Sequence, residues 1–109
     1  MAFDSAIRDS GGVTAAMRDA QAAAFDAWDA LLEHEYQAMF ALASGSRRER
    51  LRHAQRAWLA FDQAQAAWDR AMHAEEGTSA ALAVAAAATS RRRARTCELD
   101  TDLHSLREE

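Results

Sequence analysis

The sequence lacks lysine and proline, and its 109 residues include one cysteine, Cys97. A single cysteine excludes an intrachain disulfide, and we expect Cys97 to be a half-buried structural thiol. The absence of proline removes the residue that interrupts helices most strongly. Valine, isoleucine and threonine together number only eight, which argues against a β protein because strands are enriched in β-branched residues. A chain of this length is typical of one domain.

Alanine dominates the composition, with 29 residues against 25 larger apolar side chains. Alanine has the highest helix propensity, and the larger side chains are numerous enough for the core of a small helical bundle. The sequence contains no run of about 20 apolar residues, so it predicts no membrane span. The net charge of −4 gives the chain no overall attraction to nucleic acid or to an anionic membrane.

Three clusters of turn residues, at positions 10–12, 44–46 and 76–79, divide the chain into segments of similar length. We predict an all-α fold, an antiparallel bundle of three long helices formed by residues 13–109 and preceded by a flexible segment, residues 1–12. The first helix is expected from Val13 to Ala43, and the third begins after Gly77. Thr89 and Ser90 mark a place where the third helix could break, because both hydroxyls can bond back to a preceding carbonyl.

The second helix has the clearest apolar pattern. Its stripe advances in steps of three and four residues, which places the members on one face of a helix: Leu51, Ala54, Trp58, Phe61, Gln65, Trp68 and Met72. We expect Trp58, Phe61 and Trp68, together with Trp28 of the first helix, to be largely buried. Gln65 either fixes the register between helices or lies at the rim of the core.

Charge is segregated along the chain. Residues 1–40 carry a net charge of −5, residues 41–74 carry +3, and residues 75–109 carry −2. We therefore expect the basic second helix to lie between or beside the two acidic ones, with short connections making successive helices antiparallel. Asp26, Asp29 and Glu33 recur at helical spacing and form an acidic face on the first helix. This face is our candidate protein-binding surface, because it would attract a basic protein at low salt.

Four arginines occur within five residues of the third helix, at positions 91, 92, 93 and 95. Such a tract could contact nucleic acid or act as a localisation signal, but it lacks interleaved aromatic residues. We favour an ion-pair cluster of Arg92, Arg95 and Asp62, since counting away from the turn at Gly77 places the tract level with Asp62 and with the acidic face. Arg92 continues the spacing of the leucines that follow it, and it is expected to face inward.

The sequence contains no arrangement of residues typical of an enzyme. A glycine-rich phosphate loop, a Ser–His–Asp set and paired cysteines at zinc spacing are all missing. Three acid–histidine pairs have a spacing that is ordinary for stabilising pairs on a helix surface: Glu49/His53, Asp69/His73 and Asp100/His104. We therefore predict a non-enzymatic protein with no metal site and no cofactor.

Residues 51–61, LRHAQRAWLAF, resemble the signature of the LprI-type lysozyme inhibitor family, in which most bacterial members are of unknown function. The positions that match its second-helix motif are Gln55, Arg56, Trp58 and Phe61. Upstream, a second group has the spacing of the family's first helix: Met17, Phe25, Ala27, Asp29, Leu32 and Tyr36. Downstream, residues 76–78 resemble its glycine-rich break, and residues 95–99 resemble its closing motif. The resemblance covers about residues 15–103.

The resemblance implies a helical, non-enzymatic protein-binding module whose partner is a lysozyme or another basic protein. Family members usually carry several cysteines and an export signal, whereas Ala20 and Ala66 stand near expected cysteine positions here. Read from Met1, the sequence has no signal peptide and predicts a cytoplasmic protein, but removal of a signal would make it periplasmic or secreted. The alternative function is a cytoplasmic structural or self-associating bundle with no inhibitory activity. The sequence leaves the formation of a homo-oligomer open.

Overall fold

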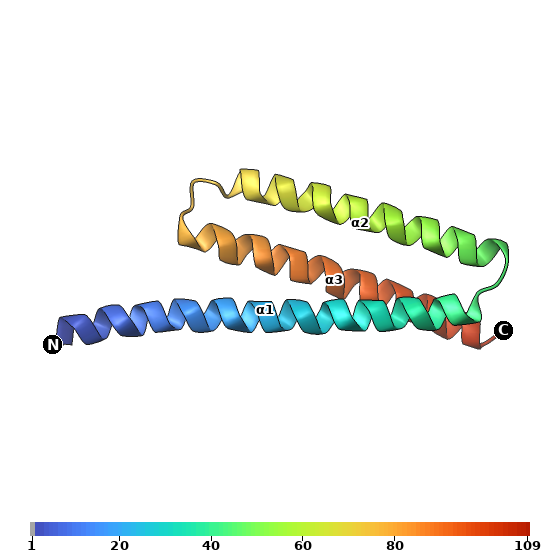
Figure 1. The fold of residues 1–109 in the computed structure, drawn as a ribbon, viewed down its shortest axis with the longest axis horizontal. Helices are drawn as coiled ribbons and strands as arrows, with labels where there is room; N and C mark the ends of the chain where they lie inside the picture. Colours follow the sequence, from blue (N-terminus) through green and yellow to red (C-terminus); the bar gives the residue numbers. More distant parts are fainter. Residues whose placement is uncertain (1) are drawn as a thin grey trace.

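The computed structural model describes the backbone of residues 2–109 and the side chains of residues 15–77 and 79–109. Three long helices make up the fold (Figure 1): α1 (Ala2–Leu42), α2 (Ser46–Met72) and α3 (Thr78–Arg107). Residues 2–109 contain no strand, and the predicted all-α class is confirmed. Within the described part of the chain, no helix combines the length and the apolar character needed to cross a membrane.

α3 is the central helix of the bundle. α1 runs parallel to α3 and packs closely along it, whereas α2 runs antiparallel to both and contacts mainly α3 (Figure 1). Direct contacts between the backbones of α1 and α2 are few, so the basic α2 packs mainly against α3 and meets α1 through side chains such as Arg48, which donates to the carbonyl oxygen of Phe40. The buried residues that join α1 to α3 come from the second half of α3, Leu99 and Leu103.

α1 begins earlier than the sequence predicts. Its backbone is helical from Ala2, so the expected start at Val13 is wrong, and the helix continues through Gly11 and Gly12. Each glycine costs a helix about 1 kcal/mol relative to alanine, which weakens the helix without ending it. The flexibility of residues 1–12 stays a prediction, and their side chains lie outside the described set.

Glycine is required in both connections between helices. Gly45 directly precedes α2 with φ of 57°, and Gly77 directly precedes α3 with φ of 65°. Other residues adopt this left-handed backbone only with strain, because their Cβ atoms clash. The two turns are short, and they make successive helices antiparallel as predicted.

The core joins α1 to α3 near the end of the bundle that holds the C-terminus (Figure 1). Leu32 and Met39 of α1 are buried there against Leu99 and Leu103 of α3. Partly buried side chains surround them: Tyr36, Ala38, Leu51, Trp58 and Leu106. Most of the core is thus supplied by α1 and α3. α2 contributes only the partly buried side chains of Leu51 and Trp58.

α2 is rotated relative to the apolar stripe predicted for it. Phe61 is 54% exposed and Trp68 is 59% exposed, so the prediction that both are largely buried is wrong. Trp28 and Trp58 are half-buried. The less exposed residues of α2 follow a different and largely polar line along the helix: Leu51, Gln55, Trp58, Asp62, Gln65 and Asp69.

The arginines of α3 explain this rotation. Half-buried guanidinium groups are costly unless carboxylates lie beside them, and α2 supplies those carboxylates from Asp62 and Asp69. Turning Phe61 and Trp68 inward would move both carboxylates away from α3. Satisfying the charges therefore takes precedence over burying two aromatic rings.

α3 is continuous from Thr78 to Arg107. The expected back-bond is present, because Thr89 Oγ1 donates a hydrogen bond to the carbonyl oxygen of Ala85 at 3.0 Å. This bond does not break α3. Cys97 is exposed rather than half-buried.

Candidate functional site

A groove lies between α1 and α2, where the two helices diverge beside α3. α1 contributes an acidic edge and an apolar floor, and α2 contributes a basic edge with one amide and one leucine. The residues that line it are Asp29, Leu32, Glu33, Tyr36, Arg52, Gln55, Arg56 and Leu59. These side chains converge because each set recurs every three or four residues on its own helix.

The two edges of the groove carry opposite charges. On α1, Glu33 accepts a hydrogen bond from Gln37 at 2.8 Å. On α2, Arg52 donates to Glu49 at 2.9 Å, and its guanidinium lies 5.3 Å from the centre of the Phe40 ring. The groove is therefore suited to a partner surface that itself presents charges of both signs around an apolar centre.

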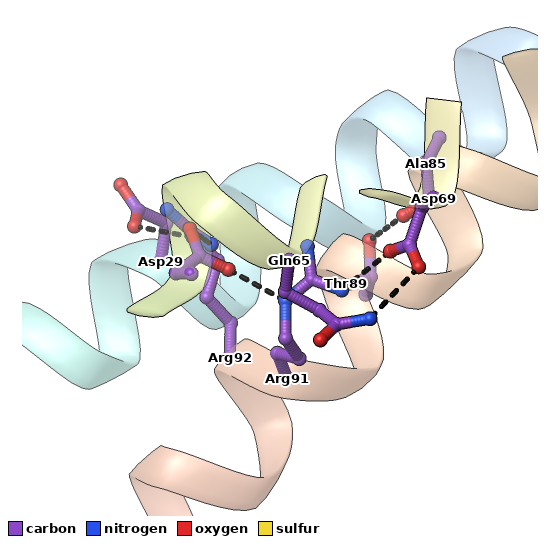
Figure 2. Close-up of polar contacts among 8 residues, drawn as sticks. Asp29, Gln65, Asp69, Ala85, Thr89, Arg91 and Arg92 are labelled. Atoms are coloured by element: carbon purple, nitrogen blue, oxygen red, sulfur yellow. Dashed lines mark hydrogen bonds and ion pairs between the residues drawn. The ribbon is translucent and has the colours of Figure 1, made fainter. Parts of the chain in front are cut away.

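An ion-pair cluster of five residues lies between α3 and its neighbours: Asp29, Asp62, Asp69, Arg91 and Arg92 (Figure 2). Asp62 is its centre, because Arg91 Nε donates to one carboxylate oxygen at 2.8 Å and Arg92 Nη1 donates to the other at 2.7 Å. Only 7% of Asp62 is exposed. Both arginines also have a second partner, Asp69 for Arg91 at 2.7 Å and Asp29 for Arg92 at 3.0 Å.

Two amide side chains extend this cluster along α2. Gln65 Nε2 donates to the Asp69 carboxylate at 3.1 Å (Figure 2), so Gln65 orients Asp69 from within the interface. Arg95 Nε donates to Gln55 Oε1 at 3.1 Å. Since Gln55 also lines the groove, and Asp29 belongs to both groups, the ion-pair cluster holds the groove residues in place.

Aromatic rings cover the arginine of the cluster that lies nearest α1. The Arg92 guanidinium carbon lies 4.4 Å from the centre of the Phe25 ring and 5.4 Å from the Trp58 ring. Cations over aromatic faces are attracted by the ring quadrupole. Arg93 differs, because it is exposed and lies 5.9 Å from the Trp28 ring.

The structure brings some of the predicted site residues together and separates others. Arg92 and Asp62 form an ion pair, but Arg95 bonds to Gln55 and Glu98 instead of Asp62. Of the acidic face, Asp29 and Glu33 line the groove, while Asp26 is exposed on the same helix.

The four positions of the second-helix motif lie in three different surroundings. Gln55 and Arg56 line the groove, and Trp58 packs against the core. Phe61 is exposed and is not among the groove residues.

Sequence reasoning missed three residues of this region. Arg52 and Leu59 line the groove, and Asp69 binds Arg91. Arg52 and Leu59 lie three or four residues from Gln55 and Arg56, and Asp69 lies seven residues after Asp62, so helical periodicity could have indicated all three.

The charges of the cluster perturb its pKa values. A hydrogen bond from Arg91, followed by one from Gln65, lowers the pKa of the Asp69 carboxyl. Burial alone would lower the pKa of the Arg91 guanidinium, but its hydrogen bonds to Asp62 and Asp69 outweigh burial and raise that pKa. Both directions favour the charged forms, so this pair is ionised at neutral pH.

Acidification is expected to destabilise the bundle partly through Asp69. Its pKa is lower in the folded chain than the ordinary value of about 3.9, so its stabilising contribution is complete above that pH and is lost as the pH falls through the lowered pKa. An Asp69→Asn variant should lose less stability on going from about pH 7 to about pH 3. The Asp69→Asn variant should keep part of the pH dependence of stability, because it still contains Glu109, whose pKa is lowered by Arg47. Urea denaturation at both pH values measures the difference, and equal losses in the two proteins would contradict this role of Asp69.

A family profile described as "Lysozyme inhibitor LprI" matches residues 6–99 of the chain. The chain belongs to the LprI family. A search of curated proteins and a search of solved structures each gave no significant match. The resemblance seen in the second-helix motif is thus confirmed over most of the chain.

The part of the chain that matches LprI contains the complete groove and the complete ion-pair cluster. The LprI match ends at residue 99, within the core segment of α3. The LprI fold in this chain has a central α3 with α1 packed along it, and α2 is attached through ion pairs and through Leu51 and Trp58.

Proposed function

We propose that this LprI-family chain is a non-enzymatic protein-binding module that inhibits a lysozyme, and that the lysozyme binds at the groove between α1 and α2. One observation carries the proposal: residues from both helix motifs by which the sequence resembles the family lie in this groove. They are Asp29, Leu32, Tyr36, Gln55 and Arg56. Asp29, Glu33 and Arg52 of the groove are each held by a hydrogen bond or ion pair, which supports a fixed binding surface.

Electrostatics support a basic partner. Asp26 and Glu33 are exposed on α1, and residues 1–40 carry a net charge of −5. Asp29 is paired with Arg92, so within the acidic face we expect Asp26 and Glu33 to attract a basic partner more strongly than Asp29 does. Charge complementarity of this kind mainly raises the association rate at low salt.

A muramidase assay with a basic lysozyme and an excess of the purified protein tests the proposal. We expect the lysozyme to lose activity, and titration calorimetry at low salt to show a complex that weakens as salt screens the charges. Full lysozyme activity together with no calorimetric complex would leave a structural or self-associating bundle as the function.

Two variants with the same change in net charge locate the binding surface. Glu33→Arg reverses a charge in the groove, and we expect it to weaken the complex by about tenfold or more, as for a charge at the centre of an interface. Asp19→Arg reverses an exposed charge on the same helix, about 21 Å away at 1.5 Å per residue, and should have a much smaller effect. Equal weakening by both variants would mean that overall charge, not the groove, determines binding.

A further inference from the structure

A second line of residues on α2 is exposed and faces neither α3 nor the groove. Steps of three and four residues connect Ala54, Ala57, Phe61, Ala64, Trp68 and Ala71, and each of them is exposed. We call this line the outer stripe. Leu59 lies on the opposite side of α2 from Trp68, because nine residues at about 100° per residue amount to two and a half turns.

The outer stripe contains the largest exposed apolar side chains of α2. Phe61, Trp68 and the adjacent Met72 are 54%, 59% and 58% exposed. Isolated exposed apolar residues are ordinary, but a continuous apolar row that includes large side chains marks a surface that contacts another molecule. The row lies outside the groove, so the proposed lysozyme site does not cover it.

The elongated chain has a larger accessible surface than a compact monomer of its mass. This surface measures 7527 Å², whereas a folded monomer of 12.0 kDa is expected to expose about 6,000 Å². Part of the difference lies in α1, whose N-terminal end extends past the turn between α2 and α3 (Figure 1).

We propose that two copies of this chain form a symmetric dimer in which their outer stripes pack together with the α2 helices antiparallel. The stripe is self-complementary in this arrangement because large and small side chains alternate along it. In the register that places position 50 opposite position 75, Trp68 of one copy lies opposite Ala57 of the other. Phe61 lies opposite Ala64 in the same register. Each large side chain then fills the space beside an alanine, as in well-packed helix pairs.

Charges at the two ends of the outer stripe favour the same antiparallel register, in which position 50 lies opposite position 75. Arg50 is exposed one helical step before Ala54 and also lines a pocket with Asp102 and Glu109 at the C-terminal end of the chain. Glu75 is exposed in the turn that directly follows α2. The antiparallel pairing brings Arg50 of each copy next to Glu75 of the other, twice in a two-fold dimer. A parallel pairing would instead place like charges side by side. The partner is therefore a second copy of this chain.

Sedimentation equilibrium of the intact protein tests the dimer. We expect a concentration-dependent rise in mass from 12.0 kDa toward twice that value. Trp68→Glu should weaken the dimer by about tenfold or more, as expected for a central aromatic residue of an interface. The matched control is Leu59→Glu, which introduces the same charge on the opposite side of α2 and should leave the dimer unchanged.

Charge exchange tests the register independently of the aromatic residues. Arg50→Glu and Glu75→Arg should each weaken the dimer, and the double variant should restore it, because each contact then has its charges reversed. A wild-type protein that stays monomeric up to about millimolar concentration would overturn the proposal. So would a Leu59→Glu variant that is weakened as much as Trp68→Glu, or a double variant no better than the single ones. Loss of lysozyme binding in Trp68→Glu, with wild-type protein monomeric, would assign the stripe to the lysozyme instead.

Discussion

Replacing Asp62 with alanine is expected to lower the free energy of unfolding by about 3–5 kcal/mol. Asp62 accepts hydrogen bonds from both Arg91 and Arg92, and its removal leaves two half-buried guanidinium groups without their shared carboxylate. A loss of this size is a large part of the total stability of a small domain, about 5–15 kcal/mol. Urea denaturation followed by far-ultraviolet circular dichroism measures it.

Asp29→Ala is the matched control for Asp62→Ala. Asp29 also pairs with Arg92, but its side chain is 55% exposed, so its loss should cost less than about 1 kcal/mol. Arg92→Ala should cost more than Arg93→Ala, and Arg91→Ala should be closer to Arg92→Ala, because Arg91 has two carboxylate partners as well. A loss at Asp62 no larger than that at Asp29 would contradict the ion-pair cluster as a structural element.

Leu99→Ala is expected to cost about 2–5 kcal/mol. Leu99 is 1% exposed and packs with the other leucines and the methionine that join α1 to α3. Truncation would therefore leave a cavity at the main contact between the two helices. The thermal or urea unfolding transition of the variant measures the loss.

Phe61→Ala is the control for Leu99→Ala. Although phenylalanine is the larger side chain, Phe61 is 54% exposed, so its truncation should change stability by less than about 1 kcal/mol in dilute solution. The dilute condition matters because association would add stability that depends on concentration. A larger loss at Phe61 than at Leu99 would show that the apolar stripe predicted for α2, and not the observed polar one, faces the core.

Helix number, the turns and the all-α class follow from local signals in the sequence. Gly45 and Gly77 lie where the backbone turns, and high alanine content keeps the segments between them helical. The start of α1 is different, because no residue before Val13 strictly forbids a helix. Gly11 and Gly12 make the helix less stable but do not end it. For this reason the two glycines alone could not predict where α1 begins.

The orientation of α2 could not be read from its apolar spacing. Two lines of residues on this helix both advance in steps of three and four, one through Phe61 and Trp68 and one through Asp62 and Asp69. Spacing alone favours the apolar line. The choice depends on the opposing surface of α3, where Arg91 and Arg92 need carboxylates, and this requirement is a tertiary effect that no window of α2 contains.

The ion-pair cluster could be predicted in part from the sequence. Counting residues from the turn at Gly77 placed the arginine tract level with Asp62, and the structure pairs Arg92 with Asp62. Counting residues gives the height of each side chain along the bundle axis, but it does not give the direction in which the side chain leaves its helix. Arg95 therefore has Gln55 and Glu98 as partners, and Arg91 has Asp69, which lies two turns from Asp62 along α2.

Backbone amide NMR of the labelled protein, titrated with a basic lysozyme at low salt, tests the proposed function most directly. The shifted resonances are expected to belong to the two edges of the groove, residues 26–36 of α1 and residues 52–59 of α2. The outer stripe from Ala54 to Ala71 should respond only where it overlaps the second of these ranges. Shifts concentrated at Phe61 and Trp68, or no shifts at saturating lysozyme, would contradict the groove as the binding site.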